Sequence, residues 1–244
     1  MLFDGKEKGK KIEVLFKDWE KINQKNDFQY KESFKKLKKQ LELAEIEGYD
    51  KVFLDEKFIT HKNHQPEHKE CGMIKEKKKT STVTEKRICR CMKYFGQHNF
   101  CKECPLKYKY HNISKTYKII DAEVPTIKDI KSCGGIDLVF ENIKNPNIKY
   151  AVEVKPPKSK ETLVRMIAEI YTYTTEEEFK NYKKAIAFFD KSEQELFYEK
   201  FKNEDFFKDV IKDITIFKFV YKDNLNGVID FDIVNLTDNE QFNK

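Results

Sequence analysis

The chain has 244 residues, of which 39% are hydrophobic and 37% are charged, and it contains 20 Phe and 12 Tyr. This much aromatic surface can form a buried core, which excludes a chain that is disordered throughout. The length suits one large domain or two small ones. No stretch approaches 18 apolar residues and the first residues lack the apolar region of a signal peptide, so we expect a soluble, cytoplasmic protein without membrane contact.

The net charge of +6 is concentrated in one quarter of the chain. Residues 61–116 carry 14 Lys and Arg against 5 Glu, whereas the remainder carries 34 basic against 37 acidic residues. A local basic surplus is the usual electrostatic footprint of nucleic-acid binding. We therefore expect this segment to hold nucleic acid, with Arg87, Arg90 and Lys93 among the contacting residues.

Apolar residues at helical spacing predict helices over residues 10–24 and 30–47. From residue 117, short β-branched and aromatic runs alternate with helical stretches at 160–174 and 191–210. This order predicts an α/β fold in which a mixed central sheet is flanked by helices. The expected domains are N-terminal helices that pack on the core (1–60), a basic Cys/His-rich insertion (61–116) and the sheet domain (117–244).

The basic window also holds all five histidines and five of the six cysteines. Clustered cysteines in a chain without a secretion signal bind metal more often than they form disulfides. The pattern predicts a structural Zn²⁺, and the alternatives are an iron–sulfur cluster or a loop with free thiols. The predicted zinc ligands are Cys89, Cys91, Cys101 and Cys104, with Cys71 and His68 as alternates.

Residues 148–155 alternate between apolar and polar side chains, so Glu153 and Lys155 are neighbours on one sheet face. The preceding strand contains Asp137. If Phe140 and Ile148 close the hairpin between the two strands, Asp137 lies diagonal to Glu153, with Cβ atoms roughly 5–8 Å apart.

Two carboxylates at that distance can share a divalent cation, which activates water and neutralises the charge that develops on phosphorus during phosphodiester hydrolysis. A lysine beside them can orient or deprotonate the water, or stabilise the pentavalent intermediate. Lys155 is placed for this role, and Glu123 in the preceding strand is a further candidate ligand.

The pattern Gly135-Ile136-Asp137, then fifteen residues, then Glu153-Val154-Lys155 resembles the PD-(D/E)xK nuclease superfamily. The RecB-type nucleases within it carry a polar residue and an aromatic residue four positions apart in the crossover helix, the relation of Glu169 to Tyr173. The family usually has Gln at the position of Glu169.

The resemblance implies a restriction-endonuclease-like core over residues 117–244. It also implies a catalytic Mg²⁺ or Mn²⁺ held by Asp137, Glu153 and the backbone carbonyl of Val154. We assign Arg165, as a phosphate fork, to substrate binding together with Glu169 and Tyr173.

The leading hypothesis is therefore a metal-dependent deoxyribonuclease, with DNA favoured over RNA as substrate. The alternatives are a non-catalytic nucleic-acid-binding protein that uses the basic zinc segment on a degenerate nuclease fold, and an interaction protein. The sequence leaves open whether cleavage begins at ends or inside the strand, and whether the chain forms a homo-oligomer.

Overall fold

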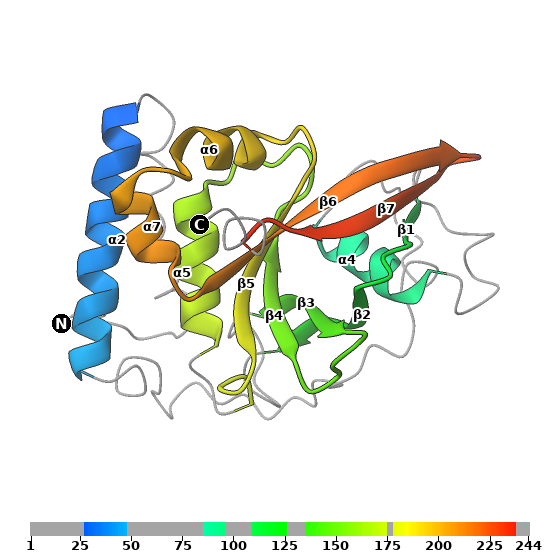
Figure 1. The fold of residues 1–244 in the computed structure, drawn as a ribbon, viewed down its shortest axis with the longest axis horizontal. Helices are drawn as coiled ribbons and strands as arrows, with labels where there is room; N and C mark the ends of the chain where they lie inside the picture. The colour runs from blue at the N-terminus through cyan, green and yellow to red at the C-terminus, as the bar shows by residue number, and fades with distance from the viewer. Residues whose placement is uncertain (1–26, 48–84, 96–108, 126–134, 175–177, 238–244) are drawn as a thin grey trace, which may run out of the picture.

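The computed structural model describes residues 27–47, 85–95, 109–125, 135–174 and 178–237. These residues form five helices and seven strands (Figure 1). In chain order they are α2 (Asp27–Glu47), α4 (Glu85–Tyr94), β1 (Lys109–Asn112), β2 (Tyr117–Pro125), β3 (Gly135–Asn142), β4 (Lys149–Val154), α5 (Leu163–Tyr173), β5 (Lys183–Phe189), α6 (Glu193–Phe201), α7 (Asp205–Ile211), β6 (Ile214–Leu225) and β7 (Val228–Asn235).

The predicted helix over 30–47 corresponds to α2, that over 160–174 to α5, and the stretch 191–210 to the two helices α6 and α7. The helix predicted over 10–24 lies outside the described residues. None of the helices in the described part of the chain is both long and apolar enough to cross a membrane.

All seven strands belong to one sheet, in the order β1-β7-β6-β5-β4-β3-β2. The two edge strands, β1 and β2, are consecutive in the chain, with only residues 113–116 between them. This connector spans at most about 18 Å, because an extended chain covers about 3.6 Å per residue. Seven flat strands at about 4.8 Å spacing would place the edges about 29 Å apart. The sheet therefore curls until its edges approach each other.

Contacts across the interior confirm this curl. The Asn235 side chain on β7 donates a hydrogen bond to the Tyr117 hydroxyl on β2 at 3.3 Å. The Tyr117 ring also lies 4.9 Å from the ring of Phe217 on β6, and Phe140 on β3 lies 6.2 Å from Phe219 on β6. Strands several positions apart in the sheet order thus share one aromatic core.

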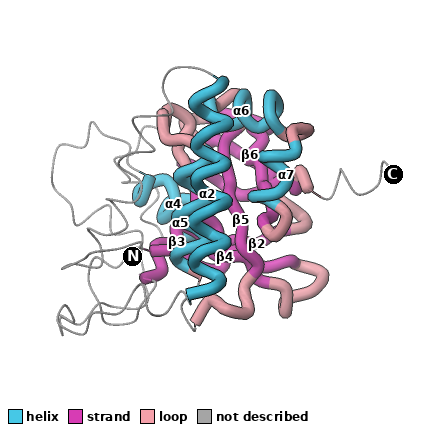
Figure 2. Tube along the Cα trace, turned by 90° about the vertical axis from the view of Figure 1, so that its left-hand side faces the viewer, coloured by secondary structure: helices cyan, strands magenta, loops and turns pink. Residues whose placement is uncertain are grey.

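The predicted central sheet flanked by helices, and with it the restriction-endonuclease-like core, is wrong: the sheet is a nearly closed barrel. Its inward-facing side chains include many aromatic rings, and they form one cluster with residues of helix α4. On the outer face α5 packs on β3, β4 and β5, with α2, α6 and α7 beside it (Figures 1 and 2).

Two described elements of the predicted 61–116 insertion belong to this barrel. Helix α4 packs on β1, β2 and β3, and its residues Ile88 and Met92 are buried in the interior cluster. Strand β1 pairs in parallel with β7, where Lys109 is level with Val228. Helix α4 and strand β1 of this window therefore pack and pair with the sheet, and the predicted domain bounds stay a prediction.

Candidate metal centre

Three acidic residues lie at one level on three adjacent strands. Glu123 on β2 is opposite Asp137 on β3, because the pairs on both sides of this position are in register. The β3–β4 register, extended by one residue, places Glu153 opposite Asp137. The pairs that fix this alignment are Ala122–Leu138 and Val124–Ile136 between β2 and β3, and Leu138–Val152 between β3 and β4.

The β3–β4 register differs by two residues from the predicted one. Phe140 pairs with Tyr150 rather than with Ile148. The side-chain oxygen of Asn142 accepts hydrogen bonds from the backbone N–H groups of Lys144 and Asn145, which places a turn in this connection. The shift brings Asp137 from a diagonal position to one directly opposite Glu153.

The backbone around Glu123 is unusual for a strand. Glu123 has φ 57°, in the left-handed region that a non-glycine residue adopts at a cost of about 1–2 kcal/mol. The neighbouring Gly135 permits a close approach of β2 to β3, since a Cβ there would lie 3.2 Å from the Val124 carbonyl oxygen. Such strain is typical of sites where a side chain must point in one direction.

Helix α4 adds a fourth acid that the sequence analysis missed. Carboxylate oxygens of Glu85, Asp137 and Glu153 all lie within 4.8 Å of one another. Asp137 and Glu153 are 8% and 2% exposed, and Glu85 is half-buried. Oxygen atoms from three carboxylates at this separation can hold a hard divalent cation.

The sequence-predicted lysine lies inside this group of acids. Lys155 is 3% exposed, and its Nζ lies within ion-pair distance of four carboxylates. The partners are Glu153 at 2.6 Å, Glu161 at 3.0 Å, Glu85 at 3.1 Å and Glu169 at 3.4 Å. The structure thus brings Lys155 and Glu153 together as the sequence predicted, and it also joins α4 and α5 to the site.

Burial and mutual repulsion shift the protonation of these acids. Burial raises the pKa of Asp137 well above its ordinary value, and the Glu85 and Glu123 carboxylates add to the shift against the opposing charge of Lys155. Burial likewise raises the pKa of Glu153, with a further contribution from Asp137. Both acids are therefore costly to ionise unless a cation lies beside them.

The pKa values of Lys155 and Glu169 are shifted in the directions that favour their charged forms. Burial alone would lower the pKa of Lys155, but the carboxylates of Glu153, Glu169 and Glu85 outweigh it and raise the pKa well above the ordinary value. The pKa of Glu169 is lowered despite its burial, because Lys155, Glu153 and Arg165 favour its ionised form. Lys155 is consequently an ammonium ion at neutral pH.

The residues predicted to bind substrate fall into two groups. On α5, Arg165 Nε lies 3.0 Å from Glu169 and 3.4 Å from Glu161, so its guanidinium is already engaged by carboxylates. Glu169 is buried beside Lys155, and the pKa of Tyr173 is raised well above its ordinary value by burial and by the Glu169 charge. These residues therefore border the acidic centre.

The second group, Arg87, Arg90 and Lys93, lies on α4. The Nε of Arg90 is buried and has no hydrogen-bond partner among the described residues. Lys93 Nζ lies 5.7 Å from the centre of the Tyr94 ring. Their contact with nucleic acid stays a prediction.

The structure does not bring the two described zinc-ligand candidates together. Cys89 and Cys91 are two positions apart on α4, so their side chains point to different sides of the helix. The Cys91 sulfur accepts a hydrogen bond from the Tyr110 backbone at 3.3 Å, whereas Cys89 faces the acids. The remaining zinc candidates, Cys101, Cys104, Cys71 and His68, lie outside the described residues.

Val154, whose carbonyl the resemblance assigns to the metal, holds Asp137 through its other backbone group. Its N–H donates a hydrogen bond to Asp137 Oδ2 at 2.8 Å. This bond fixes the carboxylate on β3 against the end of β4, and the role of the Val154 carbonyl stays a prediction.

No family model, no curated protein and no solved structure matches this chain. The geometry of the acidic centre therefore carries the functional argument.

Proposed function

We propose that the protein is a Mg²⁺- or Mn²⁺-dependent nuclease that hydrolyses phosphodiester bonds in DNA. The observation that supports this most is the excess of carboxyl groups over cationic side chains in and around the buried centre. Six carboxylates, contributed by Glu85, Glu123, Asp137, Glu153, Glu161 and Glu169, surround two cationic side chains, Lys155 and Arg165. Buried charges without a counter-ion cost folding free energy, and a divalent cation removes that cost.

The donor set fits a hard cation. Glu85, Asp137 and Glu153 would hold it, since carboxylate oxygens are the ligands that Mg²⁺ and Mn²⁺ prefer. When bound, such a cation lowers the pKa of a water molecule and neutralises charge on a phosphate. The Val154 N–H keeps Asp137 oriented for this role.

The ion pairs of Lys155 indicate which of its possible roles in the hydrolysis is favoured. Its raised pKa favours the protonated ammonium over the neutral amine that could act as a base. A protonated lysine donates hydrogen bonds, so it can orient a water molecule or stabilise a negatively charged phosphorane. Among the roles considered from the sequence, we therefore favour orientation and charge stabilisation over proton abstraction.

The test compares two isosteric variants with a matched control. Asp137→Asn keeps an oxygen that can accept the Val154 hydrogen bond, and Glu153→Gln keeps the shape of its side chain. Glu195→Gln makes the same chemical change at the ion pair of Lys218 on β6, which includes none of the six acids of the centre. Each protein is incubated with plasmid, single-stranded DNA and RNA in Mg²⁺ and in Mn²⁺.

We expect the wild type and Glu195→Gln to cleave DNA, and the two site variants to lose at least about 100-fold in rate. Equal rates for all four proteins would refute the proposal. A wild type that binds DNA with strong salt dependence but leaves it intact would instead support the non-catalytic alternative.

A further inference from the structure

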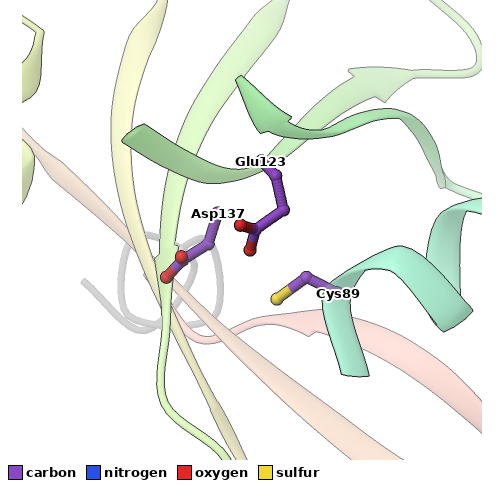
Figure 3. A group of neighbouring side chains, drawn as sticks. All are labelled: Cys89, Glu123 and Asp137. Atoms are coloured by element: carbon purple, nitrogen blue, oxygen red, sulfur yellow. The ribbon is translucent and has the colours of Figure 1, made fainter. Parts of the chain in front are cut away.

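Asp137 belongs to two groups of ligand atoms. One group includes oxygens of Glu85 and Glu153, and the other includes the Cys89 sulfur and a Glu123 oxygen. The ligand atoms of Cys89, Glu123 and Asp137 all lie within 4.8 Å of one another. Figure 3 shows the Cys89 sulfur on α4 pointing toward the two carboxylates, which come from β2 and β3.

Cys89 differs from an ordinary core cysteine. Its side chain is completely buried, and its thiol makes no hydrogen bond to any residue in the described ranges. A buried free cysteine normally packs as a small apolar side chain. Here it faces two carboxylates, and Cys91 provides the contrast on the same helix, with its sulfur hydrogen-bonded to the Tyr110 N–H.

We propose that Cys89, Glu123 and Asp137 form a second cation position, which takes Zn²⁺ and shares Asp137 with the Mg²⁺ or Mn²⁺ position. A thiolate with carboxylates is a donor set that zinc accepts, whereas Mg²⁺ prefers oxygen ligands alone. Binding replaces the thiol S–H bond by a Zn–S bond and releases the proton to solvent. The inference deepens the proposed function, on which it rests for the neighbouring Mg²⁺ position.

The shared carboxylate has a structural basis. Asp137 has two oxygens with about four lone-pair sites, of which one is used by the Val154 N–H. Glu123 lies directly opposite Asp137 on β2. It is also the strand residue with a positive φ, and its carboxylate is the second oxygen ligand of the proposed Zn²⁺ position. A sulfur-containing position and an all-oxygen position would therefore adjoin within one centre.

The experiment titrates the full chain with Co²⁺, which replaces Zn²⁺ and gives a near-ultraviolet absorption band when a thiolate binds it. The variants are Cys89→Ser and Glu123→Gln, with Cys91→Ser as the matched control on the same helix. Thermal unfolding verifies that each variant is folded. We expect Cys89→Ser to lower the band and both site variants to weaken Co²⁺ binding by roughly 10-fold or more, while the part of the band that depends on Cys89 persists in Cys91→Ser. Zn²⁺ should displace the Co²⁺.

Two results would overturn the inference. If Cys89→Ser leaves the band unchanged, Cys89 is not a ligand. If Cys89→Ser and Cys91→Ser each abolish the whole band, both sulfurs bind one metal, as in the four-cysteine arrangement. A Cys89-dependent band in a protein that cleaves no nucleic acid would refute the proposed function alone, whereas an active nuclease without that band would refute this inference alone.

Discussion

Two lysines of this protein each pair with more than one carboxylate, but they differ in how deeply they are buried. Lys218 on β6 pairs with Glu195 at 2.6 Å and Asp190 at 3.6 Å, and its side chain is 21% exposed. Lys155 pairs with four carboxylates, is 3% exposed and lies beside the buried Asp137. Water solvates the excess charge around Lys218, whereas the excess around Lys155 is buried. An unbalanced, desolvated group of charges, rather than the number of ion pairs, distinguishes the candidate site.

The largest expected effect is from removing the buried cation. Lys155→Met keeps the apolar stem but leaves four carboxylates without their central partner. We expect the free energy of unfolding to fall by about 3–5 kcal/mol, as it does when a buried ion pair loses one member. Urea unfolding at neutral pH measures it. A loss below about 1 kcal/mol would mean that the Lys155 group behaves like a surface ion pair.

Divalent cations should stabilise the fold through the acidic centre. At a concentration about 100 times the dissociation constant, Mn²⁺ should add about 2.7 kcal/mol to the stability of the wild type. Asp137→Asn removes a ligand shared by both proposed positions, so its melting temperature should respond much less. Differential scanning calorimetry with and without Mn²⁺ measures both responses, and an equal rise in the two proteins would place the binding elsewhere.

The pH dependence should reflect the raised pKa values of the acids. Asp137 and Glu153 ionise more reluctantly when folded than at their ordinary values of 3.8 and 4.5, so the folded chain binds more protons than the unfolded chain. Their contribution to stability without divalent cations therefore falls as the pH rises above those values, by about 1.4 kcal/mol per pH unit for each extra proton.

Glu169 opposes this trend, because its lowered pKa gives it a contribution that is present at higher pH and lost on acidification. The free energy of unfolding of the wild type and of Glu153→Gln, measured with a chelator between pH 4 and 8, separates the contribution of Glu153 from that of Glu169. We expect the variant to lose less stability than the wild type as the pH rises. A steeper loss in the variant would contradict the raised pKa of Glu153.

The smallest expected effect is at the partly exposed counterpart. Lys218→Met should cost about 1 kcal/mol, since solvent screens this partly exposed pair more than the Lys155 group. Although partial burial lowers the pKa of Lys218, its hydrogen bond to Glu195 and the charges of Glu195 and Asp190 outweigh that effect and raise the pKa. The stabilisation by the Lys218 ion pair is therefore present at neutral pH and is lost as the pH rises above the raised pKa. Measuring the free energy of unfolding in neutral and in strongly alkaline buffer tests this. A cost as large as that of Lys155→Met would remove the contrast between the two lysines.

The strands with clear apolar patterns could be predicted from the sequence. The β-branched and aromatic runs expected after residue 117 include β4 (Lys149–Val154) and β5 (Lys183–Phe189), which are short segments in covered positions. Strand β1 was missed because it has only four residues, and its partner β7 lies far away in the chain. The curl of the sheet also could not be predicted, since it depends on contacts such as that between Tyr117 and Phe217.

The candidate site was predicted in part for the same reason. Asp137, Glu153 and Lys155 lie on adjacent strands of a local hairpin, so alternation alone brings them near each other. Glu85 lies far from them in sequence, on a helix that the charged composition of residues 85–94 concealed. The i, i+4 spacing of Glu85 and Cys89 was the available signal, because it places both on one helix face.

The short connection between the two edge strands has a consequence for how the chain folds. Closing the barrel requires β1 to pair with β7, which joins residue 109 to residue 228. Pairings over such sequence separations form slowly, because the loop-closure entropy must be overcome first. Helix α4 packs on β1 and β2, so Glu85 and Cys89 reach the acids of the β2–β4 meander when the barrel closes. We therefore expect the complete ligand set to exist only in the fully folded chain, late in folding, after the local hairpins have formed.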